Sequence, residues 1–276
     1  MVHYTGKNRI ILFGIDMYTR YQKHSIGDSA AALTYYMLFA FFPFLIFLSN
    51  LLGKLDFPTL PFEQLRMIIP HDVLEIVQNY LIHVKAVSST QLLVFGLVFS
   101  IYFPVRAMYS LMDCICRAYE VPERRGIVHR FMVVLLLAAS LVFLIVASLP
   151  IMLLGKNFLY WLGGFLPLNF DVIEFWDGIR FIVMGGLLFI TLTLFYVIAP
   201  SVVIHIKEAL PGAMVALVGW LAFSKIFSFY VENIASYSAV YGSIGAIIVL
   251  LLWLYATSMT LIIGAEVNAF FSKKRR

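Results

Sequence analysis

The sequence has 276 residues, of which 62% are hydrophobic and 13% are charged. Soluble domains average about 45–50% apolar and about 25% charged residues, so the composition excludes an ordinary soluble domain. The formal net charge of +5 does not indicate nucleic-acid binding, because the basic residues lie between apolar segments rather than on one face. The composition favours a membrane protein, and we predict a single membrane domain over residues 1–276.

The first 29 residues are mostly polar and do not have the short apolar core and cleavage site of a secretory signal peptide. Residues 9–23 contain four apolar side chains at helical spacing and four charged ones on the other side: Ile10, Phe13, Met17 and Tyr21, against Arg9, Asp16, Arg20 and Lys23. This pattern predicts that residues 1–29 form a cytoplasmic amphipathic segment, with a helix lying along the membrane interface.

Six apolar runs follow, and each is long enough to supply the roughly 20 residues that a helix needs to cross a bilayer. They cover residues 30–52, 86–105, 131–154, 181–204, 209–231 and 233–265. Lys225 is the only Asp, Glu, Lys or Arg inside them. The alternation of apolar and polar residues that a β-barrel requires is absent. We therefore predict an all-α polytopic membrane helix bundle with six transmembrane helices.

The segments between the runs set the expected orientation. Residues 53–85 carry apolar residues at helical spacing, interrupted by Pro70, which predicts a helical external loop. Thirteen Lys and Arg residues lie on the side of the two termini, including the basic tail at 272–276, against four on the other side. Because short cytoplasmic loops are enriched in Lys and Arg, we expect both termini, and this tail, in the cytoplasm.

Several short motifs along the chain carry a family resemblance. They are AAALTYY from Ala30 with Pro43 after it, Tyr119-Glu120, LPGA from Leu210, YGSIGA from Tyr241, LWLY from Leu252 and GAEVN from Gly264. Together they resemble the YihY/virulence factor BrkB family of bacterial integral membrane proteins. The resemblance implies a six-helix, multi-pass protein of the bacterial cytoplasmic membrane. Serum resistance is associated with one branch of that family, and a ribonuclease label with some of its members.

The residues themselves do not favour a nuclease or another enzyme. A metal-dependent nuclease needs His and carboxylate ligands clustered in an aqueous site. The histidines instead stand singly in several segments: His3, His24, His71, His83, His129 and His205. Cys114 and Cys116 form one C-x-C without a second Cys/His pair at a usable spacing, which favours structural cysteines. We predict no catalytic residue, no metal and no cofactor.

Ionisable residues inside a span are costly and are functional candidates by default. Arg106, Lys225 and Glu266 stand out, and Asn268 follows in the last motif, so we take these four as candidates for a substrate pathway. Arg106 and Glu266 either form ion pairs or solvated contacts near the inner interface, or line a cavity open to the cytoplasm. Lys225 either reaches the outer headgroups or approaches Glu232. Four arginines compete as partners of Glu266: Arg117, Arg124, Arg125 and Arg130.

Two prolines, Pro43 and Pro104, lie inside predicted spans. Each removes one backbone hydrogen bond and frees the carbonyl four residues earlier. The resulting kinks would either widen a central cavity or serve helix packing alone. Both prolines are therefore candidate kink positions.

No ATP-binding loop or nucleophile motif is visible in the sequence. The leading hypothesis is a transporter or lipid-flipping protein, not driven by ATP, for an amphiphilic or envelope-related substrate. The alternative is a non-transporting membrane scaffold or partner protein in envelope maintenance. Expected partners are membrane lipids and no nucleic acid. A transporter should enclose a polar cavity containing Arg106, Lys225 or Glu266, whereas tight ion pairs or headgroup contacts without a cavity would favour the scaffold.

Overall fold

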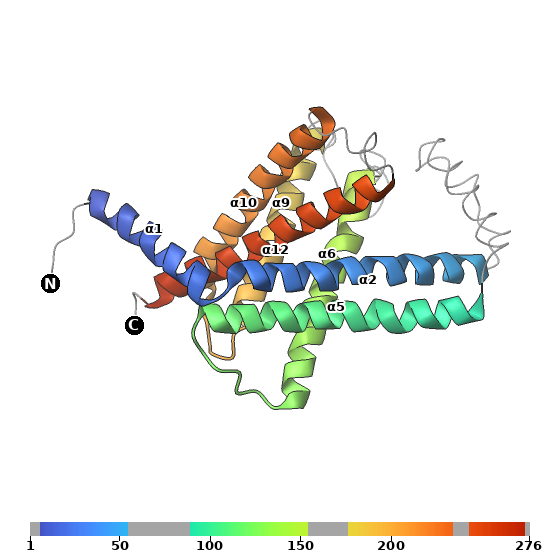
Figure 1. Ribbon diagram of the computed structural model, residues 1–276, viewed down its shortest axis with the longest axis horizontal. Helices are drawn as coiled ribbons and strands as arrows, with labels where there is room; N and C mark the ends of the chain where they lie inside the picture. Colours follow the sequence, from blue (N-terminus) through green and yellow to red (C-terminus); the bar gives the residue numbers. More distant parts are fainter. Residues whose placement is uncertain (1–5, 55–88, 154–175, 234–242, 274–276) are drawn as a thin grey trace, which may run out of the picture. The chain divides into compact units, whose positions relative to one another are not determined.

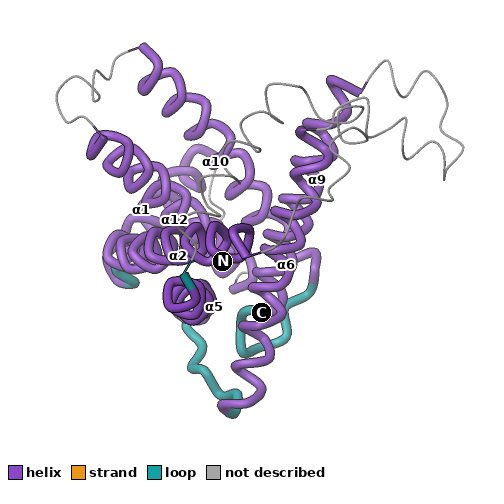
Figure 2. The backbone as a smooth tube through the Cα atoms, turned by 90° about the vertical axis from the view of Figure 1, so that its right-hand side faces the viewer, coloured by secondary structure: helices purple, strands orange, loops and turns teal. Residues whose placement is uncertain are grey.

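The computed structural model describes residues 6–54, 89–153, 176–233 and 243–273 (Figure 1). Every regular element in these four ranges is an α-helix, as the tube in Figure 2 also shows. The all-α prediction is therefore confirmed. Most of the predicted external loop at 53–85 and of the predicted basic tail at 272–276 lies outside the described residues.

Six helices of the described part are long and apolar enough to cross a membrane, which confirms the predicted number of spans. A helix suits a bilayer because it satisfies all interior backbone hydrogen bonds within one segment. The helices that contain the spans are α2 (Ile26–Lys54), α5 (Thr90–Ala118), α6 (Ile127–Leu153), α9 (Trp176–Ile198), α10 (Ile206–Asn233) and α12 (Ser243–Lys273).

Two spans differ from the charge-free runs that predicted them. The charge-free run of the second span stops at residue 105, and Arg106 was placed within the span; α5 continues through Arg106 and Asp113 to Ala118. Asp113 is compensated by Arg130, whose Nη2 lies 2.5 Å from its carboxylate. The last charge-free run stops at residue 265, just before Glu266, whereas the span in the described residues continues to Ser272. A charge therefore does not end a span where a partner side chain is in reach.

A seventh helix, α1 (Gly6–Lys23), precedes the spans. Phe13, Met17 and Tyr21 of its predicted apolar face are half-buried, and Phe13 packs edge-on against Phe270 with ring centroids 5.0 Å apart. The assignment of Arg20 to the outward charged face is wrong, because this residue is only 7% exposed. Its buried position depends on a partner from α12, the carboxylate of Glu266. The placement of α1 along the membrane interface stays a prediction.

The chain divides into two compact units. Unit 1 comprises residues 1–38, 104–138 and 189–276, and unit 2 comprises residues 39–103 and 139–188. Helices α2, α5, α6 and α9 contribute to both. In α5 the boundary between the units falls at Pro104 itself. In α2 it falls at Phe39, and Pro43, four residues later, has no N–H to donate to the carbonyl of Phe39. The kinks at the two prolines and the single membrane domain both stay predictions.

In unit 1, α10 and α12 touch at two glycines. A Cβ atom on Gly212 would overlap the carbonyl oxygen of Gly264 and the side-chain amide of Asn268. That amide is fully buried, accepts from the backbone N–H of Gly212 at 2.6 Å and donates to the carbonyl of Ala209 at 3.0 Å. Both backbone groups flank Pro211, which has no N–H of its own. Asn268 therefore joins α12 to α10 through backbone groups next to Pro211.

In unit 2, α2 and α5 approach closely at Gly96, where a Cβ atom would lie 2.6 Å from the backbone nitrogen of Phe47. Asn50 accepts at 2.8 Å from the N–H of Ser89 and donates to its own helix at Ile46. Stacked or tilted rings continue the contact: Phe95, Phe99, Phe103 and Phe39. Small residues and aromatic packing thus join these helices.

Candidate functional site

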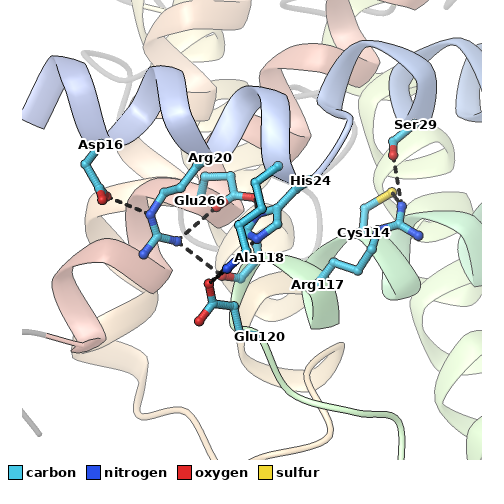
Figure 3. A network of polar contacts seen from close by, with 10 residues as sticks. Asp16, Arg20, His24, Ser29, Cys114, Arg117, Ala118, Glu120 and Glu266 are labelled. Atoms are coloured by element: carbon cyan, nitrogen blue, oxygen red, sulfur yellow. Dashed lines mark hydrogen bonds and ion pairs between the residues drawn. The ribbon is translucent and has the colours of Figure 1, made fainter.

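The deepest ionisable side chain in the described chain is that of Glu266 on α12, which is fully buried. Its Oε2 accepts from Nη1 of Arg20 at 3.1 Å, and its Oε1 lies 2.5 Å from Nδ1 of His24 (Figure 3). Both partners come from α1 and the turn after it, and the side chains of Arg20 and His24 are 9% and 8% exposed. Two ionisable groups near the N-terminus and one in the last helix are therefore brought together away from solvent.

The end of α1 places the side chains of Arg20 and His24 beside each other. Arg20 and His24 stand four residues apart, so they share one face of the helical turn. The N–H of His24 still donates to the carbonyl of Arg20 at 2.9 Å. Ser25 then takes a left-handed conformation with φ of 47°, which ends α1 and lets α2 begin at Ile26. The break thus falls immediately after His24.

The end of α5 supplies the third part of the site. Its last turn closes with bonds from Glu120 N–H to the Arg117 carbonyl and from Val121 N–H to the Cys116 carbonyl, the pattern of a Schellman motif. Glu120 holds the left-handed position of this motif, with φ of 54°. A non-glycine residue there costs roughly 1–2 kcal/mol. The described residues hold only one other positive-φ non-glycine, Ser25, so both flank this site.

We name Asp16, Arg20, Lys23, His24, Glu120 and Glu266 the acid–base cluster. Its inner members, Arg20, His24 and Glu266, are the buried ones. The outer members are partly exposed: Asp16 accepts from Nε of Arg20 at 2.7 Å, and Glu120 accepts from Nζ of Lys23 at 2.6 Å. Arg20 also donates to the carbonyl of Ala118 at 3.3 Å, where the negative end of the α5 dipole favours a cation.

Arg20 is the fixed charge of the cluster. Burial opposes the charge of its guanidinium, but the hydrogen bonds to Asp16 and Glu266 outweigh that cost and raise its pKa above the ordinary value. An arginine so placed stays protonated at any physiological pH. It is a permanent positive charge beside the buried carboxylate of Glu266.

The four predicted pathway residues do not gather at this site. Glu266 is in it, whereas Asn268 serves α10 at the helix crossing. Arg106 is exposed on α5, with its guanidinium 3.1 Å from the hydroxyl of Tyr36 and over that ring. Lys225 is exposed on α10. Their role in a substrate pathway stays a prediction.

Three of the four arginines predicted as possible partners of Glu266 make other contacts. Arg117 donates to Ser29 and to the sulfur of Cys114, Arg125 to the carbonyl of Ala199, and Arg130 to Asp113. The partners that sequence reasoning missed are Arg20 and His24. One signal was available: positions 13, 17, 20, 21 and 24 follow a single helical stripe, so both cations share the apolar face.

Other features of the described part do not add a pathway or a metal centre. An open, apolar pocket of about 850 Å³ is lined by residues between Gly126 and Leu136, at the start of α6. Glu266, Arg106 and Lys225 are not among its lining residues. Within the described residues, no three His, Cys, Asp or Glu side chains lie close enough to share a metal ion. The acid–base cluster is therefore the candidate functional site.

Comparison with known proteins identifies relatives over almost the whole chain. A family model described as "Virulence factor BrkB" matches residues 17–276. The ribonuclease-like protein YfkH of Bacillus subtilis (strain 168) is 30% identical over 262 residues, which cover 95% of each chain. The cluster residues Arg20, Lys23, His24, Glu120 and Glu266 all lie inside the matched family region.

Longer membrane proteins are also similar. A UPF0761 membrane protein of Alcanivorax borkumensis is 28% identical over 94% of this chain and 60% of its own length. One from Chromohalobacter salexigens is 26% identical over 95% of this chain and 63% of its own length. The chain thus spans somewhat under two thirds of these two relatives. No solved structure matches it.

Proposed function

Because this chain belongs to the virulence factor BrkB family and has six helices able to span a membrane, we propose that it moves an amphiphilic, envelope-related substrate, such as a lipid, across the bacterial cytoplasmic membrane without ATP. One observation carries the proposal: a fully buried carboxylate, Glu266, is held within a span by Arg20 and His24. Stability alone does not require this carboxylate, because apolar residues of similar size often stabilise a fold as well as a buried ion pair does. Buried ionisable groups in spans are typical of transport proteins.

The proposed mechanism uses the exchange of partners at the cluster. While the carboxylate of Glu266 contacts Arg20 and His24, the acid–base cluster is closed. When they separate, Arg20, Lys23 and His24 become available to an anionic headgroup, whose phosphate would replace the carboxylate of Glu266. An amphiphile with an anionic head is therefore the proposed substrate class. The role is transport, and we propose no enzymatic activity.

The proposed orientation places both termini in the cytoplasm. It rests on the thirteen Lys and Arg residues on that side against four on the other. The acid–base cluster would then face the inner leaflet. A cysteine at Tyr18, which is 67% exposed on α1, should react with an impermeant maleimide only after the inner membrane of spheroplasts is permeabilised. Labelling of intact spheroplasts would reverse the orientation.

The second candidate function is a non-transporting scaffold or partner protein. It is favoured by the closed ion pairs of Glu266 and by the exposed positions of Arg106 and Lys225 outside the apolar pocket. In this case the cluster would only fix the register of α1 against α12.

Purified protein in liposomes separates the two candidates. Scrambling of fluorescent phospholipids with anionic or zwitterionic heads, and ion flux, would be compared among the parent, Glu266→Gln and Arg106→Gln. We expect the parent to move anionic lipid faster than protein-free liposomes, and Glu266→Gln to change that rate at least about tenfold, since about 1.4 kcal/mol of altered barrier is sufficient. Arg106→Gln shows whether this pathway candidate, which lies outside the cluster, also affects the rate.

The outcomes are distinct. A parent that moves no lipid and no ion, while eluting as a folded protein, would favour the scaffold. Transport that Glu266→Gln leaves unchanged would remove the cluster from the mechanism. Mass spectrometry of lipids that remain bound to the purified parent would narrow the substrate class independently.

A further inference from the structure

The apolar pocket of about 850 Å³ at the start of α6, between Gly126 and Leu136, is not used by the proposed mechanism. We name it the α6 groove. It begins where the loop from α5 enters α6 (Figure 1). Ile127 in its wall is 88% exposed, more than any other large apolar side chain in the described part of the chain. Exposed apolar surface of this kind marks contact with lipid or with another apolar partner.

The α6 groove follows the first turns of a membrane span. The span of α6 begins at Ile127, and Leu136, at the far end of the groove, lies about 14 Å further along the helix at 1.5 Å per residue. Half of the hydrocarbon core of a bilayer is about 15 Å thick. The groove therefore extends over nearly the depth of one leaflet, which is the length that the acyl chains of a phospholipid occupy.

The loop before α6 carries an exposed cation next to the groove. Arg124 stands two residues before Gly126, where the groove begins. The following residue, Arg125, is turned toward the protein: its Nη2 donates to the carbonyl of Ala199 at 2.6 Å, and its Nε pairs with Glu123 at 3.5 Å. The nearest acid in the sequence is thus occupied. Among the described residues, no carboxylate forms an ion pair with Arg124.

Another face of α6 is packed against unit 1, and this fixes the groove. Val134 and Leu137 are fully buried. Arg130 pairs with Asp113 of α5 at 2.5 Å, and its guanidinium lies over the ring of Tyr109. The groove is therefore formed before a ligand arrives, so little ordering cost opposes binding.

We propose that the α6 groove binds one anionic phospholipid, with its phosphate at Arg124 and His129 and its acyl chains along Met132 and Leu136. Charge complementarity selects the head, because a guanidinium binds phosphate through two N–H groups. His129 lines the groove, and its ring supplies an N–H donor in either neutral tautomer. The apolar wall that follows matches the chains. This inference concerns a lipid bound to unit 1 away from the acid–base cluster, and it holds whether or not the protein transports a substrate.

Site-directed quenching on the full chain identifies the occupant. Bimane would be attached to Met132→Cys in the groove or to Val142→Cys further along α6, positions that are 59% and 58% exposed, in a background with Cys114→Ala and Cys116→Ala. Nanodiscs would contain equal amounts of phosphatidylglycerol and phosphatidylcholine, with bromine on the acyl chains of one lipid at a time. Bromine quenches bimane only at short range, so the two quenching values give the local ratio of the lipids.

We expect phosphatidylglycerol to be enriched about fivefold at position 132, because one arginine beside an anionic lipid contributes about this factor. At position 142 the two lipids should quench nearly equally. Arg124→Gln should abolish the enrichment at position 132, whereas Arg124→Lys keeps the charge and should retain most of it. Lys207→Gln removes an exposed cation from the start of α10 and should leave the enrichment unchanged.

Native mass spectrometry supplies a second measurement without the label and with both cysteines in place. The parent, exchanged from detergent into an equal mixture of the two lipids, should retain one phosphatidylglycerol in preference to phosphatidylcholine. Arg124→Gln should lose this preference, and Lys207→Gln should keep it.

Several results would overturn the proposal. Equal quenching by both lipids at position 132 would reduce the groove to ordinary lipid-facing surface. An enrichment that Arg124→Gln leaves unchanged, or that Lys207→Gln lowers equally, would exclude a site at Arg124. Quenching by neither lipid would mean that protein, such as a second copy of this chain, covers the groove. Because no readout uses lipid or ion flux, these results remain decisive if the transport proposal fails.

Discussion

The two units of the molecule are built differently. Apart from Pro43, every buried apolar side chain of the described chain belongs to unit 1, from Ile26 in α2 to Ala269 in α12. In the described part of unit 2, only Pro43, Asn50 and Gly96 are buried. Unit 1 therefore has a core of its own, whereas unit 2 exposes most of its described apolar surface, which suits contact with lipid.

The difference extends to polar contacts. In unit 1 buried polar side chains join helices distant in sequence: Arg20 with Glu266, and Asn268 with α10. In the described part of unit 2, one buried polar residue, Asn50, reaches the residue before α5. Within a bilayer such polar ties make a helix arrangement specific, because a wrong arrangement leaves them unpaired. Substitutions in unit 1 should accordingly have the larger effects.

The largest effect is expected for Glu266→Ala. It leaves Arg20 and His24 buried opposite each other without their acid, and loss of one partner of a buried ion pair costs about 3–5 kcal/mol. The free energy of unfolding would be measured by SDS titration in mixed micelles. Adding Arg20→Met to Glu266→Ala should recover part of the loss, because the unpaired guanidinium is removed as well. A double variant that simply adds both losses would contradict the pairing.

Gly212→Ala tests the crossing of α10 and α12. The added Cβ meets the carbonyl of Gly264 and the amide of Asn268, so overpacking should cost about 3 kcal/mol. The matched control is Gly185→Ala in the unit 2 part of α9, where nothing lies within 4 Å of the new atom. There the helix should gain up to about 1 kcal/mol. Both variants would be compared with the parent by thermal unfolding. Equal effects at the two glycines would contradict the close contact between α10 and α12.

A pair of asparagine substitutions compares the polar ties of the two units. Asn268→Ala leaves the N–H of Gly212 and the carbonyl of Ala209 without their partner in a buried place, which should cost about 2–3 kcal/mol. Asn50→Ala removes one bond between segments and one within α2, and should cost about 1 kcal/mol. The same SDS titration ranks them. A larger loss for Asn50 would reverse the comparison between units.

The smallest effect is expected for Lys23→Ala. Its ammonium is 2.6 Å from Glu120, but the two side chains are 60% and 34% exposed, so the pair contributes no more than about 0.5 kcal/mol. High salt should reduce even this difference. The measurement is the unfolding free energy at two ionic strengths. A loss comparable with that of Glu266→Ala would show that the outer members of the cluster are as important as the inner ones.

The number of spans could be predicted from the sequence because each span needs only a long apolar run. Their ends were predicted only coarsely, since a charge-free run stops at the first charge although the helix continues beyond it. Asp113 lies inside α5 and Glu266 inside α12 because the cations Arg130 and Arg20 compensate them, and Arg117 donates to the hydroxyl of Ser29. Such compensation depends on residues that are close only after folding. Helix ends in a membrane protein therefore follow tertiary contacts as well as hydropathy.

The site was predicted in part. Glu266 was predicted as a candidate because a carboxylate in an apolar helix is energetically costly. Its partners were sought among arginines at the ends of spans, whereas the actual ones, Arg20 and His24, belong to α1 and the turn after it. Arg20 was assigned to the outward charges because it is charged, although its position lies on the stripe of Phe13, Met17 and Tyr21. Only the contact with Glu266, 246 residues further along the chain, explains why an arginine is buried there.

That separation sets the order in which the protein is completed. Arg20 and His24 are synthesised early, but Glu266 enters the chain 246 residues after Arg20, which takes roughly 12–50 s at about 5–20 residues per second. During this interval the two cations are without their carboxylate and α1 has no final place. The buried ion pair can therefore form only once the sixth span has been inserted, so the attachment of α1 marks the end of assembly.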